Sequence, residues 1–361
     1  MKVLHVFKDY YPPTVGGIEL HINDIVHSME GVEFEVLTSA RSRRHVEDMD
    51  GAVRVVRTPE YARPTSTPVT PAWIGHLRRT DADLVHFHVP NPFGELAVLA
   101  SRTPAPIVAS YHSDIVGRRW ALPFYLPLQR RMLAKARAII VGSPPMRRAA
   151  QVAPFIDQTV IVPYGIDPEP WRPRPSGADA IRDRHEPPIV VCLGRLAYYK
   201  GLDVLLQAMR GIEGTLILVG SGPLRPNLEA QARGSRVVFA GEVKQEDRAA
   251  YLHAADVFVL ASTMRAEAFG IAMLQAMACG TPVVSTELGT GTSWLNVDGE
   301  TGLVVPPNDA AALAAALRSL LGDPPRARDM GQAAMRRVSE KFTKHAMIEV
   351  LTQVYGSAVG S

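Results

Sequence analysis

Short apolar runs alternate with longer amphipathic stretches along most of the chain, and after a break the same alternation starts again. The apolar runs have the length of buried strands, and the amphipathic stretches have the periodicity of helices. Such alternation favours a parallel sheet with helices on both faces. The sequence predicts strands at 3–7, 34–38, 53–57, 84–88, 107–111, 138–141 and 160–162 and, after the break, at 189–193, 216–219, 237–239, 257–260, 282–285 and 302–305.

The break is a stretch at 163–188 that is rich in proline and poor in apolar residues, which is typical of a linker. We therefore expect an α/β protein of two doubly wound, Rossmann-like domains, at 1–165 and 189–343, with a linker at 166–188. A last helix at about 344–361 is expected to pack back on the first domain. Domains of this kind bind ligands at the carboxyl ends of their strands, so we expect them to face one another across a binding cleft.

Composition narrows the function classes. With 47% hydrophobic and 21% charged residues, the 361-residue chain is not disordered, collagen-like or a coiled coil. Its net charge of +3 does not favour a nucleic-acid binder. The two cysteines stand in apolar runs and predict buried thiols. Without a secretion signal or a membrane-spanning run, we expect a cytoplasmic location.

Two loops that open helices could bind phosphate. Gly16 and Gly17 separate the first strand from the first helix, where free amides suit an anion, although a simple tight turn would need the same glycines. Arg195 and Lys200 stand five residues apart after a strand of the second domain. They could supply two cations to a diphosphate, and the alternative is a solvated basic loop.

A third glycine-containing loop is Val-Gly-Ser-Gly-Pro at 219–223. A dinucleotide-binding fingerprint needs one more glycine, where this chain has Arg225. We therefore assign the loop to turn geometry.

Glu267 stands at the start of a helix, and Gln275 follows about two turns later, roughly 12 Å along the helix axis. Two polar residues so placed can contact separate parts of one long ligand. A carboxylate that only stabilises the helix dipole is the alternative for Glu267. The small residues at 289–293 suggest a further anion-binding turn.

Together these segments resemble the family 4 retaining glycosyltransferases of GT-B fold, which use nucleotide-diphospho-sugars. The resemblance covers nearly the whole chain. The variants YYKG and ELGTGTS are similar to those of bacterial mannosyltransferases for surface polysaccharides. The motifs that carry it are the Gly16-Gly17 loop, His112-Ser113-Asp114, GRLAYYKG at 194–201, VGSGP at 219–223, EAFGIAML at 267–274 and ACGTPVVSTELGTGTS at 278–293.

The resemblance implies an acceptor-binding first domain and a donor-binding second domain, with no separate acid–base pair because the leaving diphosphate helps to deprotonate the acceptor. It makes His112, Arg195, Lys200 and Glu267 catalytic, with His112 at the sugar near its anomeric centre, Arg195 and Lys200 on the diphosphate and Glu267 on the sugar hydroxyls. Lys200→Ala is then expected to lower turnover with the fold intact. The donor-binding set that it implies is Gly16, Gly17, Arg195, Lys200, Gly241, Val243, Glu267, Phe269, Gly270, Ile271 and Gln275.

One position departs from the family pattern. Family members usually have Glu where this chain has Gln275, and a carboxylate accepts hydrogen bonds from both ribose hydroxyls. An amide accepts only through its carbonyl oxygen. We therefore expect Gln275 to hold the ribose less tightly.

Metal use is not expected. The Asp-x-Asp pairs at 48–50 and 81–83 lack the context of a cation site. His86 and His88 lie on one face of a strand and could bind a metal, but we favour a cleft or packing role for them.

Residues 118–137 mix basic and aromatic side chains, and the stretch 115–150 has eight basic residues and no acidic one. This pattern favours contact with an anionic membrane surface, and the alternative is a solvated cationic helix face.

The sequence thus predicts a metal-independent hexosyltransferase without a cofactor, with GDP-mannose as the favoured donor and a glycan, glycolipid or lipid-linked acceptor in cell-envelope synthesis. It would work in the cytoplasm, at the inner face of the membrane if the basic segment binds there. The alternatives are a UDP-sugar-dependent enzyme with a small acceptor, a GT-B nucleotide-sugar epimerase and a non-catalytic nucleotide-binding protein. Two other classes are disfavoured. A nicotinamide-dependent oxidoreductase would need a third glycine in the 219–223 loop region, and this sequence does not have it. A two-domain solute-binding protein would normally have an export signal, and none is visible.

Overall fold

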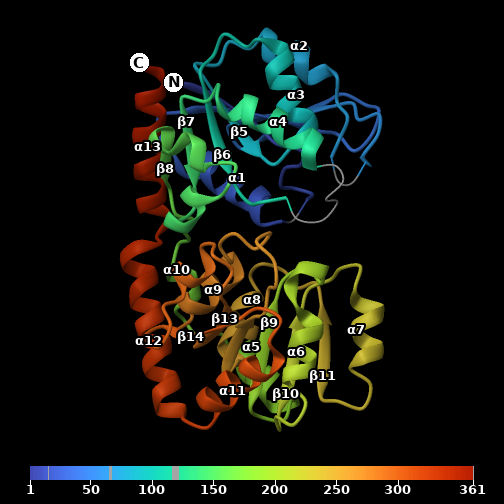
Figure 1. Cartoon of the computed structure of the whole chain (residues 1–361), viewed down its shortest axis with the longest axis vertical. Helices are drawn as coiled ribbons and strands as arrows, with labels where there is room; N and C mark the ends of the chain where they lie inside the picture. The colour runs from blue at the N-terminus through green and yellow to red at the C-terminus, as the bar shows by residue number, and fades with distance from the viewer. Residues whose placement is uncertain (15, 65–66, 116–121, 361) are drawn as a thin grey trace. The chain divides into compact units, whose positions relative to one another are not determined.

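The computed structural model of the chain describes residues 1–14, 16–64, 67–115 and 122–360. The chain divides into two compact units, each built around one sheet (Figure 1). Unit 1 consists of Met1–Pro163 and Lys344–Ser361, and unit 2 consists of Tyr164–Thr343. Every strand predicted from the sequence overlaps an observed strand, and the prediction of two Rossmann-like α/β folds is confirmed.

The sheet of unit 1 has the strand order β3-β4-β2-β1-β5-β6-β7-β8. All neighbouring strands are parallel except β3 and β4, which pair antiparallel at the edge. The winding of the sheet reverses between β1 and β5, and ligands of such sheets bind at this point. The strands are β1 (Lys2–Val6), β2 (Glu33–Ser39), β3 (Val46–Asp50), β4 (Val53–Thr58), β5 (Leu84–Val89), β6 (Ile107–Tyr111), β7 (Ala138–Val141) and β8 (Thr159–Ile161).

The helices of unit 1 include the last helix of the chain, α13 (Lys344–Val359), drawn in red in Figure 1. One face of α13 joins the core of this unit, where Leu351 and Tyr355 pack with residues of β1, β5 and α1. Residues of α13 and of the first strands and helix therefore form one core in unit 1. The other helices are α1 (Gly17–Ser28), α2 (Ala72–Arg78), α3 (Pro92–Ser101) and α4 (Leu122–Leu133), with 3-10 segments at Pro144–Arg148 and Ala153–Gln158.

The sheet of unit 2 is wholly parallel, with the order β11-β10-β9-β12-β13-β14. Numbered within the unit, this is the order 3-2-1-4-5-6 of doubly wound nucleotide-binding folds, which bind their ligand where the order reverses. In unit 2 that point lies between β9 and β12. The strands are β9 (Ile189–Leu193), β10 (Thr215–Val219), β11 (Val237–Gly241), β12 (Val257–Leu260), β13 (Val283–Thr286) and β14 (Gly302–Val305).

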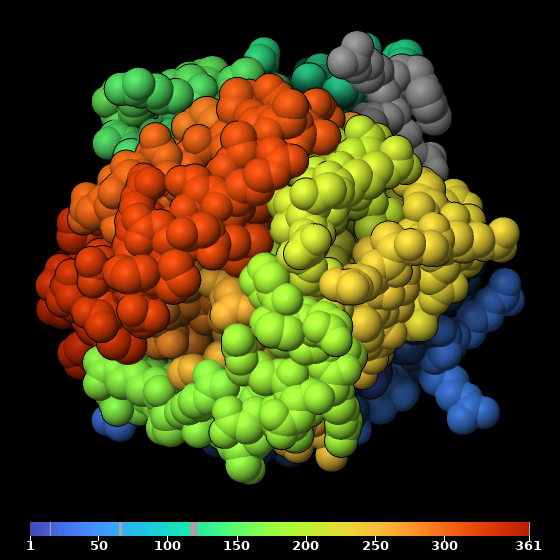
Figure 2. All heavy atoms as spheres, turned by 90° about the horizontal axis from the view of Figure 1, so that it is seen from below, coloured from blue at the N-terminus to red at the C-terminus, as the bar shows by residue number. Residues whose placement is uncertain are grey.

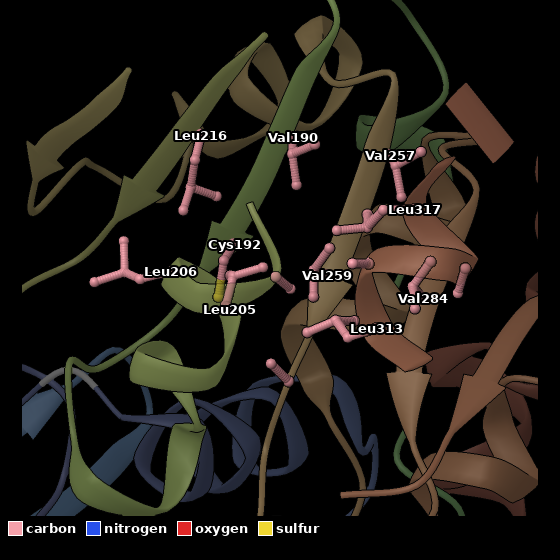
Figure 3. Packing of buried hydrophobic residues seen from close by; sticks show 14 of the residues in the cluster. Val190, Cys192, Leu205, Leu206, Leu216, Val257, Val259, Val284, Leu313 and Leu317 are labelled. Atoms are coloured by element: carbon pink, nitrogen blue, oxygen red, sulfur yellow. The ribbon is translucent and has the colours of Figure 1, made fainter. Parts of the chain in front are cut away.

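Helices cover both faces of this sheet. On one face, side chains of β9, β12 and β13 point toward Leu313 and Leu317 of α11, as Figure 3 shows. On the other face, Phe258 and Leu260 pack beneath residues of α8, α9 and α12. The orange to red residues of α11 and α12 form one continuous area in Figure 2. The helices are α5 (Ser176–Arg184), α6 (Leu202–Ala208), α7 (Arg225–Gln231), α8 (Arg248–Ala254), α9 (Ile271–Ala278), α10 (Thr292–Leu295), α11 (Ala310–Leu321) and α12 (Pro324–Lys341).

The linker expected at 166–188 differs from the structure, because most of this stretch is folded on unit 2. Helix α5 lies in it, Ala178 is fully buried and Trp171 joins the core. The Arg182 guanidinium (Nη1) donates to Asp256 Oδ1 at 2.9 Å and to the Ala254 carbonyl at 2.7 Å. The high proline content suggested a linker, but a few apolar residues and one ion pair are enough to anchor the segment.

Candidate active site

Two loops of unit 2 meet where its sheet reverses, and an ion pair joins them. Lys200 follows β9 and Glu267 follows β12, and Lys200 Nζ lies 2.5 Å from Glu267 Oε2. Ser262 Oγ donates to the same carboxylate oxygen at 2.9 Å. Each of the two charged side chains is only 12% exposed. Burial alone would lower the pKa of Lys200, but the Glu267 carboxylate outweighs it and holds that pKa above its ordinary value.

Gly201 explains how the two loops come so close. Its φ is +60°, and a Cβ there would overlap the carbonyl oxygen of Ala261 at the end of β12. The amide of Thr263 donates to the carbonyl of Tyr199 at 2.8 Å. Backbone therefore contacts backbone, which only glycine allows, and Lys200 is placed beside Glu267.

Arg195 lies in the same loop, and the glycines at 220 and 222 support it. A Cβ at Gly220 would overlap the Gly194 carbonyl, and one at Gly222 would overlap the Leu196 carbonyl. The loop at 219–223 thus fits the turn geometry that we assigned to it. The Arg195 side chain is exposed and makes no hydrogen bond or ion pair with any residue that the structure describes.

The segment at 241–243 adjoins this support. The Gly220 amide donates to the Gly241 carbonyl at 2.7 Å, and Ser221 Oγ donates to the Glu242 carboxylate. Val243 is partly buried against the core of unit 2. Gly241 and Val243 therefore lie at the carboxyl end of β11, two strands from β9.

The turn at 289–293 plays a different role from the one we expected. Thr290 and Thr292 are fully buried, and their hydroxyls donate to the carbonyls of Glu267 at 2.8 Å and of Thr286 at 3.1 Å. The Gly291 amide donates to the Ala268 carbonyl at 2.7 Å. Because these groups are already hydrogen-bonded, the turn holds the Glu267 loop in place and offers no anion-binding turn.

Helix α9 begins four residues after Glu267. The Phe269 ring is buried, with its centroid 5.0 Å from that of Tyr164, so this residue can offer a ligand only its backbone. Gly270 is the N-cap with a φ of 91°, and the first amides of the helix, starting at Ile271, have no partner within it. Further along, Gln275 is 5% exposed, and its buried Oε1 has no hydrogen-bond partner among the described residues. This orphan acceptor fits a ligand that brings hydroxyl donors.

The remaining predicted site residues, His112 and the two glycines at 16 and 17, lie in unit 1. Gly16 is the N-cap of α1, and a Cβ there would overlap the Glu19 carboxylate. An acidic group of the helix itself therefore lies where we expected room for a phosphate. Burial raises the pKa of Glu19.

His112 follows β6, and its ring is almost fully buried. Its Nε2 lies 2.8 Å from His88 Nδ1, and His88 in turn contacts His5. The rings of His5, His86 and His88 are fully buried and offer nitrogen atoms within 4.8 Å of one another. In the structure, hydrogen bonds among these rings, Ser110 and Tyr355 use these nitrogens.

The Asp-x-Asp pairs face basic or hydroxyl partners. Asp81 Oδ1 lies 2.6 Å from Lys2 Nζ, and Asp48 Oδ2 lies 3.0 Å from Arg57 Nη1. Asp50 accepts from the Tyr10 hydroxyl at 2.9 Å.

The sequence patterns missed the residues that support the site. Ser262 and Thr290 hold Glu267; Ser262 is an ordinary small residue in the sequence, and Thr290 was assigned to an anion-binding turn. His5 and Tyr355 meet although 350 residues separate them. The one sequence signal for these contacts was a histidine on each of two apolar strands. That β1 and β5 are neighbours became known only from the sheet order.

The comparisons with known proteins agree with this geometry. The model of glycosyl transferases group 1 matches residues 187–323, and that of glycosyltransferase family 4 matches residues 15–170. Sucrose-phosphate synthase from Thermosynechococcus elongatus has the same fold, with a TM-score of 0.83 at 24% identity over 99% of this chain and 98% of that one. The fold class is thus GT-B, and the protein is a glycosyltransferase.

Curated relatives define the family. The chain is 36% identical to the D-rhamnosyltransferase WbpZ of Pseudomonas aeruginosa, over 95% of this chain and 92% of the relative. It is 33% identical to the O-antigen chain mannosyltransferase C of Escherichia coli, over 100% of both chains. The chain belongs to glycosyltransferase family 4.

The ion pair changes part of our expectation for Lys200. We predict that Lys200→Met lowers the free energy of unfolding of unit 2 by about 3 kcal/mol, because it leaves the Glu267 carboxylate buried without its cation. Adding Glu267→Gln should restore most of the loss. Urea unfolding measures both. Arg225→Met, which breaks the exposed pair with Glu229, is the control and should cost about 0.5 kcal/mol or less. A Lys200→Met protein as stable as this control would contradict the prediction.

The buried histidines predict acid sensitivity of unit 1. Burial lowers the pKa of His5 to about 3 and holds the pKa values of His86, His88 and His112 well below 6.5. As the pH falls below about 6.5, the unfolded chain binds protons at these rings and the folded chain does not, so stability is lost there and not above. Each ring adds up to ~1.4 kcal/mol per pH unit.

Urea unfolding at pH 7.5, 6 and 5 checks this slope. His86→Gln should make it shallower, because the unfolded chain then binds one proton fewer. His345→Gln, which removes an exposed histidine of α13, should leave it unchanged. A free energy of unfolding that stays level from pH 7.5 to 5 would refute the prediction.

Proposed function

We propose that the protein is a retaining mannosyltransferase that transfers mannose from GDP-mannose to a glycan, glycolipid or lipid-linked acceptor in the synthesis of bacterial cell-envelope polysaccharide or glycolipid. Unit 2 would bind the donor and unit 1 the acceptor. The observation that carries the proposal is the Lys200–Glu267 pair at the reversal point of the unit 2 sheet, with Arg195, which has no partner among the described residues, in the same loop. The names of several relatives, including one GDP-mannose-dependent enzyme from Mycolicibacterium smegmatis, support the donor.

Each group in unit 2 has chemistry that suits one part of this donor. The Arg195 guanidinium and the Lys200 ammonium can stabilise the diphosphate as negative charge develops on it. The Glu267 carboxylate, the backbone at Phe269 and Gly270, and the first amides of α9, starting at Ile271, can bind sugar hydroxyls.

The nucleoside would lie further along the same edge of the sheet. Gln275 Oε1 can accept from the ribose, and backbone at Gly241 and Val243 can contact the base. In unit 1, Gly16 and Gly17 would lie beside the phosphates, and His112 would contact the sugar.

The proposed reaction needs no separate protein base. The bond between the anomeric carbon and the diphosphate oxygen breaks, and the acceptor oxygen attacks on the same face. The leaving diphosphate takes the acceptor proton. The protein then acts by positioning and by stabilising charge, in which Lys200 keeps its proton because Glu267 lies beside it.

The basic segment at 118–137 supports a membrane-bound acceptor. Residues 118–121 lie outside the described residues, and the rest belongs to α4 and the residues after it. Phe124 is 81% exposed, and Arg130, Arg131 and Lys135 are also exposed. Such a pair of apolar and basic groups suits an anionic lipid surface. In the described part of the chain, no helix is long and apolar enough to span a bilayer.

A donor panel tests the proposal. Binding and acceptor-dependent transfer are measured with GDP-mannose, GDP-D-rhamnose, UDP-glucose and NAD. We expect GDP-mannose to bind and to transfer its sugar. Arg195→Ala should weaken donor binding about tenfold, because a charge-assisted hydrogen bond is lost. It should not change thermal stability, since Arg195 is exposed and unpaired.

Arg210→Ala, which removes an exposed arginine after α6, is the matched control for charge. If the enzyme prefers UDP-glucose, its donor is a UDP-sugar and not GDP-mannose. If it prefers GDP-D-rhamnose, the nucleotide stays as proposed and only the transferred sugar differs. Release of an epimerised sugar nucleotide without transfer would contradict the transferase proposal.

The Gln275 position gives a second test. We predict that Gln275→Glu tightens donor binding severalfold, because a carboxylate accepts hydrogen bonds from both ribose hydroxyls more strongly than an amide oxygen. Titration calorimetry with GDP and with GDP-mannose measures the change. Gln275→Ala is the complementary variant and should weaken binding of both. If Gln275→Glu leaves both affinities unchanged, Gln275 does not hold the ribose.

A further inference from the structure

An unbroken chain of hydrogen bonds runs through the core of unit 1 and ends at His112. It starts on β6, passes through β5, α13 and β1, and returns to the loop after β6. Every member is buried, with at most 5% of any residue exposed. This histidine chain consists of the contacts Ser110 Oγ–His86 Nε2 (2.7 Å), His86 Nδ1–Tyr355 OH (2.6 Å), Tyr355 OH–His5 Nε2 (3.2 Å), His5 Nδ1–His88 Nε2 (2.9 Å) and His88 Nδ1–His112 Nε2 (2.8 Å).

The sheet of unit 1 builds this chain by register. His5 is paired with His86 across β1 and β5, and His88 is paired with Ser110 across β5 and β6. His86 and His88 alternate along one strand and therefore lie on the same face. Their ring centroids are 4.3 Å apart, and those of His88 and His112 are 5.1 Å apart. Helix α13 brings the Tyr355 hydroxyl to this face.

The rings of the histidine chain are neutral at physiological pH. Burial lowers the pKa of each one, and it raises that of the Tyr355 phenol. Among the described residues, His21 of α1 and Lys8 after β1 oppose the protonation of His112 further. A neutral imidazole has one donor and one acceptor nitrogen. Each ring must therefore donate on one side and accept on the other, so the whole chain has a single direction.

Two directions are possible for such a chain, and Ser110 distinguishes them. In one, the Ser110 hydroxyl donates to His86 Nε2, and every following bond points toward His112. In the other, Ser110 only accepts, and its own hydrogen needs another acceptor. Within the described residues, Ser110 Oγ has no other partner than His86. The first direction gives the Ser110 hydroxyl an acceptor, whereas the second leaves this buried donor unpaired among the described residues.

We propose that Ser110, acting through His86, Tyr355, His5 and His88, fixes His112 in the tautomer that carries its proton on Nδ1. His112 Nε2 then accepts from His88, and Nδ1 is a hydrogen-bond donor. Resting on the function proposed above, this makes His112 a donor to an oxygen of the sugar or of the diphosphate, and not a base toward the acceptor hydroxyl. Ser110 and Tyr355 are positioning residues for His112.

Nitrogen-15 NMR of the histidine rings tests the tautomer directly, in the free protein at pH 7.5. The His112 signals are assigned by their loss in His112→Gln. We expect His112 to be in the Nδ1–H form in the wild-type protein. In Ser110→Ala the chain has no donor at its start, so the Nδ1–H fraction should fall, because His86 Nε2 then lacks its partner in both directions. Ser110→Thr keeps the hydroxyl and should restore the wild-type signals.

The matched control is Ser143→Ala. Ser143 follows β7 of the same sheet, is fully buried, and its hydroxyl has no hydrogen-bond partner in the described part of the chain. Its loss should leave the His112 signals unchanged. Tyr355→Phe keeps the buried ring, cuts the chain in the middle and should release the His112 tautomer as Ser110→Ala does. The proposal is overturned if wild-type His112 is in the Nε2–H form, or if neither variant changes its tautomer.

Kinetics separate this proposal from the proposed function. In Ser110→Ala, we expect kcat to fall about tenfold with the donor Kd changed less than about twofold, since a ligand hydrogen bond is weakened and the donor site of unit 2 is intact. A shifted tautomer with unchanged kcat would overturn the role in the reaction. If the wild-type protein transfers no sugar from any donor, the proposed function fails, and the NMR result still decides the histidine chain.

Discussion

The buried contact between the Lys200 ammonium and the Glu267 carboxylate determines how the ligand edge of unit 2 is built. Either charge alone would be costly at 12% exposure, so the two loops that carry them must keep their positions together. Much of the surrounding sequence serves this need. Gly201 lets the loops touch, Ser262 bonds the carboxylate and Thr290 bonds the carbonyl of the same residue. Several positions that seemed to be ligand groups in the sequence are thus the support of one ion pair.

Unit 1 has the same kind of sheet, with its reversal point between β1 and β5, but the buried histidines that meet there are neutral. Four buried imidazoles and a phenol satisfy one another where unit 2 has an ion pair. The fold sets the position of a site, and the side chains set its chemistry. A cationic edge suits a diphosphate, and a neutral donor of fixed direction suits a hydroxyl or ester oxygen. This difference supports the roles proposed above, in which Arg195 and Lys200 of unit 2 bind the diphosphate and His112 of unit 1 donates a hydrogen bond to the sugar nucleotide.

The strands could be predicted because each central strand of a parallel sheet is a continuous apolar run. Strand β3 (Val46–Asp50) could not, because it is mostly polar and exposed at the sheet edge, where Glu47 and Asp48 form ion pairs with β4. Lys200 and Glu267 could be selected as candidate site residues by their motifs, but their contact depends on strand order, which the spacing of residues in the sequence does not contain. The same holds more strongly for Tyr355 and His5, which only the packing of α13 brings together. Proline content was misleading at 166–188, since Trp171 and Ala178 bury enough surface to fix that segment.

The hydrogen bonds that a polar group already makes distinguish supporting groups from candidate ligand groups better than its residue type does. Thr290 and Thr292 look suited to an anion, yet their hydroxyls are used by backbone. Arg195 and Gln275 Oε1 have no partner in the described residues, and both follow strands at the reversal point. Lack of a partner is not sufficient by itself, because the Ser143 hydroxyl is also buried and unpaired, in unit 1. The two conditions together select the groups that a bound donor would satisfy, because an unpaired polar group at the ligand edge gains a hydrogen bond only when the ligand arrives.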